Sequence, residues 1–345
     1  MKTTKKIIPL FLFLGLILAA CGSDDTEETG GAENDGTLTV YVGLEEEHAI
    51  ASINQFTEDT GIDVDMVRMS TGEILAKIRS EQQNPQADIW YGGPADTFVA
   101  AKEEDLLQPY QSPEAEAIPE EYRDEEGYWI GIYLGLIGFA TSQDFLDEHN
   151  LEAPASWDDL LDPAYKDMVV VAHPGSSGTA YTALYSILRA KGSDDAGFDY
   201  LKDLDNQVQQ YTTSGSAPGR MVGMNEVGAG ILFSHNIIKF QKEGFDNIVL
   251  SFPEEGTGYE VGGVGIINGT PNEELAQEFI DWAVSANAQE VGQEANAFNN
   301  LTHPDAIEPE EAADLEEIEL IDSDPIEAGE RRQEILDRWE DEVNN

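Results

Sequence analysis

Residues Met168–Thr182, MVVVAHPGSSGTAYT, decide the fold because they join a strand, a turn and the start of a helix. The β-branched run predicts a fully buried strand, which Pro174-Gly175 ends, and helical apolar spacing begins at Thr179. The strand therefore delivers short hydroxyls to a helix N-terminus. Free backbone N–H groups and the positive end of the helix dipole favour an anion there. A simple helix cap is the alternative, since Ser and Thr are preferred capping residues.

Two further turns share this composition. Ser70-Thr71-Gly72-Glu73 and Thr213–Pro218 each combine hydroxyls with glycine, and each precedes a predicted helix. A cap alone requires no glycine, whereas close approach of a ligand to the backbone does. We therefore interpret the three turns as the walls of one anion-accepting cleft.

The composition is that of a large protein with a strongly acidic surface. The chain has 345 residues, 41% of them hydrophobic, and a formal net charge of −51. This length and apolar content allow two lobes with a substantial core. The negative charge argues against nucleic acid and anionic lipid headgroups as partners, because both bind to basic surface patches. It also repels anions, but at high ionic strength the field is screened and local dipoles inside a cleft dominate.

The N-terminal segment predicts export. Residues 1–21 carry lysines, then an apolar run, then small residues, as a secretory signal does. Leu18-Ala19-Ala20-Cys21 resembles the lipobox of bacterial lipoproteins, so we predict a lipid anchor on Cys21, the chain's only cysteine. A transmembrane anchor is the alternative, but the apolar run is short for a span. Residues 22–36 are polar, acidic and glycine-rich, which predicts a flexible tether.

Strand and helix patterns alternate from Thr37 onward. Strands are expected at residues 37–42, 62–67 and 87–93, with helices between them. This alternation predicts an α/β fold with a mainly parallel sheet and helices on both faces. Ligands of such sheets bind beyond the carboxyl ends of the strands, where the Ser70 turn and Gly93 fall.

The middle of the chain predicts a second lobe. The long apolar segment 128–141 is expected to cross into it, and 259–267 to return. We therefore assign residues 37–137 and 265–345 to a first lobe and residues 138–264 to a second. The acidic C-terminal segment is expected to form one or two surface helices that pack on the first lobe.

Together these motifs resemble the solute-binding proteins of bacterial ABC importers. The similarity rests on the lipobox, the three turns, the Ala87–Gly93 strand and Gly256-Thr257-Gly258-Tyr259-Glu260. More narrowly, the chain is similar to the type II group that includes ferric-iron, thiamine, phosphonate and hexose-phosphate binders. The resemblance implies a two-lobed clamshell of α/β lobes that closes on a small anionic solute and delivers it to permease subunits. It also implies a monomer without a cofactor, attached to the membrane only through the Cys21 lipid.

The identity of the ligand depends on the segment after Gly230-Ile231-Leu232-Phe233. Ferric binders of this group carry a Tyr-Tyr pair there, whereas this chain has Ser234-His235. A His followed by a polar residue resembles the sugar-phosphate members instead. His235 and Asn236 would supply hydrogen bonds to the ligand, and Glu260 would accept sugar hydroxyls. Alternatively, His235 is hydrogen-bonded to a neighbouring loop, and Glu260 is one more solvated acid. A protein that binds Fe(III) or an Fe(III)-anion complex is the alternative ligand class.

Other function classes have less support. The five histidines are scattered, and no Gly-x-Ser-x-Gly elbow, His-Glu-x-x-His motif or cysteine cluster occurs. Ser177 with His235 lacks a third group for a catalytic triad. We therefore predict no enzyme, no catalytic residue and no metal site, with a ligand-sensing subunit as the alternative to a transport protein. The predicted ligand-binding residues are Ser70, Thr71, Gly93, Ser177, Gly178, Thr179, Ser214, Ser216, Ala217, His235, Asn236 and Glu260.

Overall fold

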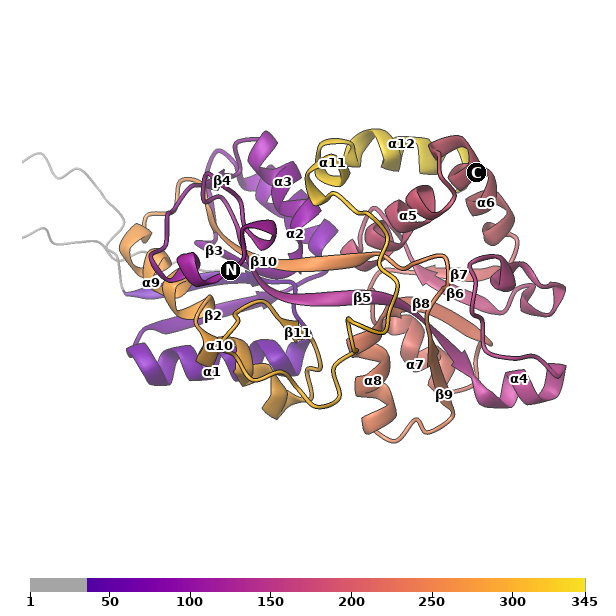
Figure 1. The fold of residues 1–345 in the computed structure, drawn as a ribbon. Coiled ribbons are helices and arrows are strands. Elements are labelled where there is room, and N and C mark those ends of the chain that lie inside the picture. The colour runs from indigo at the N-terminus through magenta and orange to yellow at the C-terminus, as the bar shows by residue number, and fades with distance from the viewer. Residues whose placement is uncertain (1–35, 345) are drawn as a thin grey trace, which may run out of the picture. The chain divides into compact units, whose positions relative to one another are not determined.

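A computed structural model describes residues 36–344 (Figure 1). The predicted signal, Cys21 and all but the last residue of the predicted tether lie outside the described residues. Among the residues described, no helix has the length and apolar character needed to cross a membrane.

The first lobe is built on three parallel strands, as the alternating pattern predicts. β1 is central, with β2 on one side and β3 on the other, and β10 runs antiparallel to β3. Apolar side chains fill both faces: α1 and α9 pack on one face of the sheet, and α2 and α3 on the other (Figure 1). The elements are β1 (Thr37–Val42), α1 (Glu46–Thr60), β2 (Asp63–Arg68), α2 (Thr71–Glu81), β3 (Ile89–Pro94), α3 (Ala95–Glu103), β4 (Leu107–Gln108), β10 (Tyr259–Ile267) and α9 (Glu273–Ala283).

The second lobe repeats this arrangement. β6 lies between β7 and β8, parallel to both, and α5 and α6 cover one face of these strands. α7 and α8 cover the other face. The elements are α4 (Gln143–His149), β6 (Val169–Ala172), α5 (Gly178–Ala190), α6 (Asp194–Asp205), β7 (Val208–Thr212), α7 (Ala217–Gly223), β8 (Ala229–Phe233), α8 (Ser234–Lys242) and β9 (Ile248–Ser251). Residues 158–161 form a short 3-10 turn.

One long strand joins the lobes. β5 (Ile130–Ser142) is buried along its whole length, pairing first with β10 and then with β8 and β9. The sheet order is therefore β2-β1-β3-β10-β5-β8-β6-β7. The predicted crossing segment 128–141 corresponds to β5, which pairs with strands of both lobes, and the predicted return segment 259–267 corresponds to β10. The exact lobe boundaries assigned from the sequence stay a prediction.

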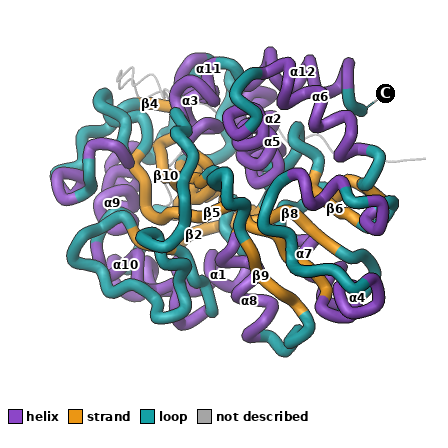
Figure 2. Tube along the Cα trace, turned by 45° about the vertical axis from the view of Figure 1, so that its right-hand side comes forward, coloured by secondary structure: helices purple, strands orange, loops and turns teal. Residues whose placement is uncertain are grey.

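The C-terminal segment differs from expectation. α10 (Ala286–Glu290) and β11 (Asn300–Leu301) belong to the first lobe, and α11 (Pro325–Glu330) packs on α3. α12 (Arg332–Glu342), however, packs on α6 of the second lobe (Figure 2). Its apolar residues Ile335 and Trp339 enter the second lobe's core, and Arg338 pairs with Asp195 of α6 at 2.9 Å. The expectation that the whole segment packs on the first lobe was wrong, because the apolar stripe of α12 fits the second core.

Candidate functional site

The three predicted turns meet where the two lobes face each other. Ser70 caps α2 in a capping box with Glu73, and Ser177 caps α5 by accepting the Ala180 N–H. The third turn leads into α7 at Ala217. Capping, the simpler interpretation, is therefore correct for Ser70 and Ser177. The first N–H groups of a helix have no partner within the helix, and a cap satisfies only some of them. Capping therefore does not prevent these turns from binding a ligand.

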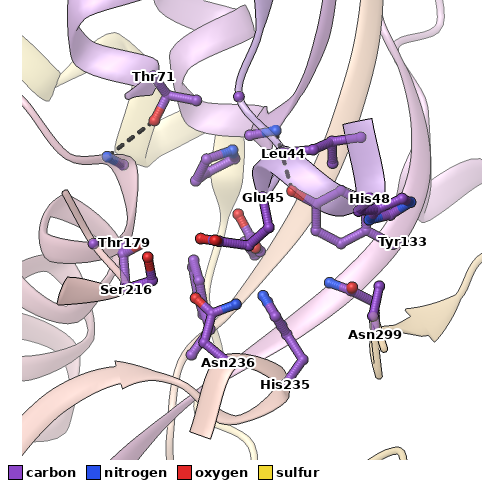
Figure 3. A pocket seen from close by; sticks show the side chains of 18 of the residues that line it. Leu44, Glu45, His48, Thr71, Tyr133, Thr179, Ser216, His235, Asn236 and Asn299 are labelled. Atoms are coloured by element: carbon purple, nitrogen blue, oxygen red, sulfur yellow. Dashed lines mark hydrogen bonds between the residues drawn. The ribbon is translucent and has the colours of Figure 1, made fainter. Parts of the chain in front are cut away.

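One cavity gathers most of the predicted residues. It encloses about 690 Å³, open solvent included, and receives side chains from both lobes (Figure 3). Ser214 and Ala217 are the exceptions, since they line the neighbouring outer cavity, with which the first shares Ser216. The predicted residues that line the inner cavity are Ser70, Thr71, Gly93, Ser177, Gly178, Thr179, Ser216, His235, Asn236 and Glu260.

The glycines of the turns serve contact between the lobes. A Cβ at Gly72 would lie 2.4 Å from the Gly175 carbonyl oxygen, and one at Gly178 would lie 2.3 Å from Thr71 Oγ1. A Cβ at Gly215 would meet Thr179 Oγ1 at 2.2 Å. Close approach of a ligand is the reason expected for these glycines from the sequence. What approaches them is the protein itself, across the lobes for Gly72 and Gly178.

Three hydrogen bonds fasten α2 to the second lobe. Gly72 N–H donates to the Ser176 carbonyl at 3.0 Å, and Gly178 N–H donates to Thr71 Oγ1 at 3.0 Å. The Ser70 hydroxyl donates to the Thr213 carbonyl at 3.3 Å. The N-termini of α2 and α5 are thus held side by side at the cavity wall.

The inner wall of the cavity carries polar groups on and around the crossing strands. Glu260 on β10 is 4% exposed, and His235 follows β8 in the first turn of α8. Both side chains lie over Gly135 of β5, since a Cβ there would be 2.9 Å from Glu260 Oε1 and 2.9 Å from His235 Nδ1. His235 Nδ1 is buried and has no hydrogen-bond partner among the described residues. Tyr133 accepts the Gly93 N–H at 3.1 Å.

Burial sets the protonation of these groups. It lowers the pKa of His48 to about 4 and that of His235 to about 3, so both imidazoles are neutral at pH 7. Burial also raises the pKa of Glu260 well above its usual range, with Asp96 adding repulsion and a hydrogen bond to Tyr133 opposing the shift. The pKa of Tyr133 rises likewise, from burial first and then from the charge of Glu260. The inner wall therefore offers neutral hydrogen-bonding groups and one carboxyl that resists ionisation.

Paired charges surround the cavity mouth. Lys239 of α8 forms an ion pair with Glu47 of α1 at 2.7 Å, which spans the lobes. Arg68 lies 3.7 Å from Glu45, at the carboxyl end of β2. These cations offset locally the negative field of the molecule.

Several lining residues were missed by sequence reasoning. Glu45 follows the carboxyl end of β1, so the strand-end rule used for Ser70 could have found it. No sequence motif pointed to the other three polar residues. Tyr133 lies within the crossing strand β5, and Asn296 and Asn299 lie in the loop before β11. The lining residues absent from the prediction that bear polar side chains are Glu45, His48, Arg68, Tyr133, Lys239, Asn296 and Asn299.

The arrangement suits a bipolar solute. Helix N-termini on one wall favour an anionic group, while carboxyl, imidazole and amide groups on the other wall suit a polar body. Within residues 36–344, no group of three or more His, Cys, Asp or Glu side chains is placed to hold a metal ion.

The fold and this interlobe site define a binding protein of the two-lobed, type II periplasmic kind. The chain belongs to the family of bacterial extracellular solute-binding proteins, which it matches over residues 84–317. It is a substrate-binding component of ABC import and an exported protein, since its relatives are periplasmic binding proteins; the family consists of transport proteins and not enzymes.

Particular relatives narrow the comparison. The solved structure of the periplasmic binding protein AfuA from Actinobacillus pleuropneumoniae, with fructose-6-phosphate bound, is 34% identical, covers 90% of this chain and 99% of its own, and has a TM-score of 0.86. An uncharacterised protein of Haemophilus influenzae is 35% identical over 323 residues, covering 91% of this chain and 93% of the relative. Iron uptake protein A1 of Synechocystis is 26% identical, covering 72% of this chain and 70% of the relative.

Proposed function

We propose that this chain captures a small phosphorylated or phosphonate solute, such as a phosphorylated sugar, between its lobes and delivers it to an ABC permease. The observation that carries the proposal is the meeting of the α2 and α5 N-termini at one cavity whose opposite side holds His235 and Asn236 (Figure 3), with Glu260 also in the lining. An anion at one end and hydrogen-bonding groups at the other match these two walls.

The helix termini supply the anion site. Each N-terminus carries roughly half a positive charge. In the first turns the Gly72 and Gly178 N–H groups donate across the lobes and those of Glu73 and Ala180 donate to the caps, which leaves the Thr71 and Thr179 N–H groups for a ligand among the described residues. The overall charge of −51 opposes an anion, but beyond a Debye length of about 8 Å at physiological salt its contribution is screened. Arg68 and Lys239 in the lining are each paired with a carboxylate, so they offset the nearby acids without adding net positive charge. The attraction for an anion therefore comes from the helix termini.

The opposite wall supplies the contacts to the body of the solute. Asn236 offers both a donor and an acceptor, and His235 in its neutral form offers one of each. Buried polar groups of this kind discriminate strongly, because a solute that fails to pair them leaves a desolvated group unsatisfied. The fructose-6-phosphate bound by the similar protein AfuA is a solute of this bipolar type.

Iron is less well supported as the ligand, although an iron uptake protein is among the relatives. Fe(III) is a hard cation that suits phenolate oxygens, and the phenol of the lining residue Tyr133 has its pKa raised by burial and by Glu260. At the position where ferric binders carry a tyrosine pair, Ser234 and His235 start α8. Neutral imidazole and a hydroxyl are poor substitutes for two phenolates.

Attachment and assembly complete the proposal. We infer that a lipid on Cys21 anchors the chain to the outer face of the membrane and that it acts as a monomer. The acidic, glycine-rich residues 22–36 would let the binding lobes reach the permease.

Isothermal titration of the purified full-length chain tests the ligand class. Glucose 6-phosphate, ethylphosphonate and inorganic phosphate are compared with glucose and with Fe(III)-citrate in high-salt buffer. We expect binding by phosphoryl or phosphonate compounds and none by glucose. Tight binding of Fe(III)-citrate with no response to any phosphoryl or phosphonate compound would overturn the proposal.

A further inference from the structure

Charges in the cavity lining are paired, with one exception. Glu45 pairs with Arg68, and Lys239 pairs with Glu47 and more weakly with Glu243. Behind the site, Asp96 pairs with Arg332 at 2.5 Å. Among the described residues, Glu260 is the lining carboxylate with no ion pair to a basic side chain. Its hydrogen-bond partner within the wall is the Tyr133 hydroxyl.

Glu260 is also almost fully enclosed. With 4% of its surface exposed, it has little water to solvate an ionised carboxylate. Burial of an unpaired charge is costly, and a group in this position either stays protonated or receives a cation from elsewhere. The raised pKa reflects the same cost.

A second unpaired acceptor lies beside it. His235 Nδ1 and Glu260 Oε1 both lie over the Gly135 backbone, each 2.9 Å from where a Cβ would stand. The absence of a side chain at Gly135 leaves room for both groups at one point of β5. His235 Nδ1 is buried without a partner among the described residues. In the tautomer with its proton on Nε2, His235 Nδ1 is an acceptor, and two acceptors then converge on one part of the cavity lining.

We propose that this pair is an ammonium subsite, so that the preferred solute is a phosphorylated or phosphonate compound that also bears a primary amine. An ammonium group supplies three N–H donors and the positive charge that Glu260 lacks. A sugar hydroxyl supplies a donor but no charge, and leaves the carboxylate uncompensated. The inference rests on the proposed function, because the phosphoryl group at the α2 and α5 N-termini positions the amine at the opposite wall.

Matched ligand pairs test this subsite. Glucosamine 6-phosphate is titrated against glucose 6-phosphate, and 2-aminoethylphosphonate against ethylphosphonate, with the full-length chain at pH 7.5 and fixed salt. Each pair keeps the anionic group and changes the amine. We expect the amine of at least one pair to improve the dissociation constant tenfold or more, equal to about 1.4 kcal/mol.

Variants assign the effect to Glu260. In Glu260→Gln the side chain keeps its size and its hydrogen-bonding capacity but cannot ionise, so the ratio of the two dissociation constants in each pair should fall to about one, whatever the change in affinity for the amine-free member. Glu45→Gln is the matched control at the same cavity, and it should keep the amine preference because Glu45 already has Arg68 as a partner. Circular dichroism and thermal melting check that both variants fold.

The outcomes separate this inference from the proposed function. Equal binding of amine and amine-free members in both pairs overturns the ammonium subsite and leaves the phosphoryl site intact. Loss of the preference in Glu45→Gln, with retention in Glu260→Gln, also overturns it. If no phosphoryl or phosphonate compound binds at all, the proposed function fails and the subsite fails with it.

Discussion

Gly72→Ala should hold the lobes apart without unfolding either one. Gly72 is the second residue of α2, and its added Cβ would lie 2.4 Å from the Gly175 carbonyl oxygen and 2.7 Å from that of Ser176. Both obstacles are backbone atoms of the opposite lobe, so no side-chain rotation relieves the contact. Ordinary van der Waals contact begins near 3.4 Å, and the turn must withdraw by about 1 Å.

The energetic effect follows from the bonds that this withdrawal breaks. Gly72 N–H to Ser176, Gly178 N–H to Thr71 and the Ser70 hydroxyl to Thr213 all join α2 to the second lobe. At a net 0.5–1.5 kcal/mol for each bond, the closed arrangement loses about 1.5 to 4.5 kcal/mol. Since only the closed arrangement surrounds the solute, the apparent dissociation constant should rise roughly 10- to 2,000-fold. Alanine is the better helix former, so the melting temperature should not fall.

Two measurements distinguish blocked closure from other faults. Titration with the best phosphorylated ligand gives the dissociation constant, and small-angle X-ray scattering with saturating ligand gives the radius of gyration. The wild-type chain should contract with ligand and Gly72→Ala should not. Ser80→Ala, an exposed change on the same helix, is the control and should behave as wild type. Unchanged affinity and normal contraction in Gly72→Ala would refute the role given to these contacts.

Three further predictions concern buried titratable groups. His235→Ala should weaken binding at least tenfold, about 1.4 kcal/mol, in the same titration; an unchanged dissociation constant removes His235 from the site. Arg332→Ala leaves Asp96, which is 5% exposed, without its partner, so urea denaturation should show a loss of about 3 to 5 kcal/mol in the free energy of unfolding. Arg79→Ala, the control at an exposed ion pair, should lose at most about 1 kcal/mol. Equal losses in the two variants would contradict the role given to burial. With folded pKa values of about 4 for His48 and about 3 for His235, against 6.5 as the unperturbed value, the unfolded state binds protons first on acidification. The free energy of unfolding should therefore fall as the pH drops from 6.5 toward 4, by roughly 1.4 kcal/mol per pH unit for each histidine. In a His48→Gln, His235→Gln double variant this fall should disappear; a fall as steep as in the wild type would show that the two histidines are not its cause.

The sequence predicted the parts of the fold that depend on local pattern. The β-branched run Val169–Val171 became the buried strand β6, and the Pro174-Gly175 break separated it from α5, because period and turn chemistry are properties of adjacent residues. The same logic located the Ser70 and Ser177 caps. The resemblance to sugar-phosphate binders, and not a local pattern, singled out His235 and Glu260, and both line the same cavity.

Features that depend on distant segments were beyond the sequence. The glycines at 72 and 178 were correctly singled out, but the atoms that crowd them come from the other lobe, which no local pattern reveals. In the sequence, Tyr133 is one more residue of an apolar strand. Only the structure shows that its hydroxyl accepts a hydrogen bond from the Gly93 N–H. α12 has an apolar stripe that fits either lobe by pattern alone, and only the structure shows that Ile335 and Trp339 enter the second lobe's core.

A crystal structure of the full-length chain with glucose 6-phosphate, or with the tighter-binding member of its amine pair, tests the anion site most directly. The phosphoryl oxygens should lie within hydrogen-bonding distance of backbone N–H groups in the first turns of α2 and α5, with the rest of the solute against His235 and Glu260. A phosphoryl group held instead by Arg220 or Lys239 in the outer cavity, away from both helix N-termini, would contradict the proposed mode of binding.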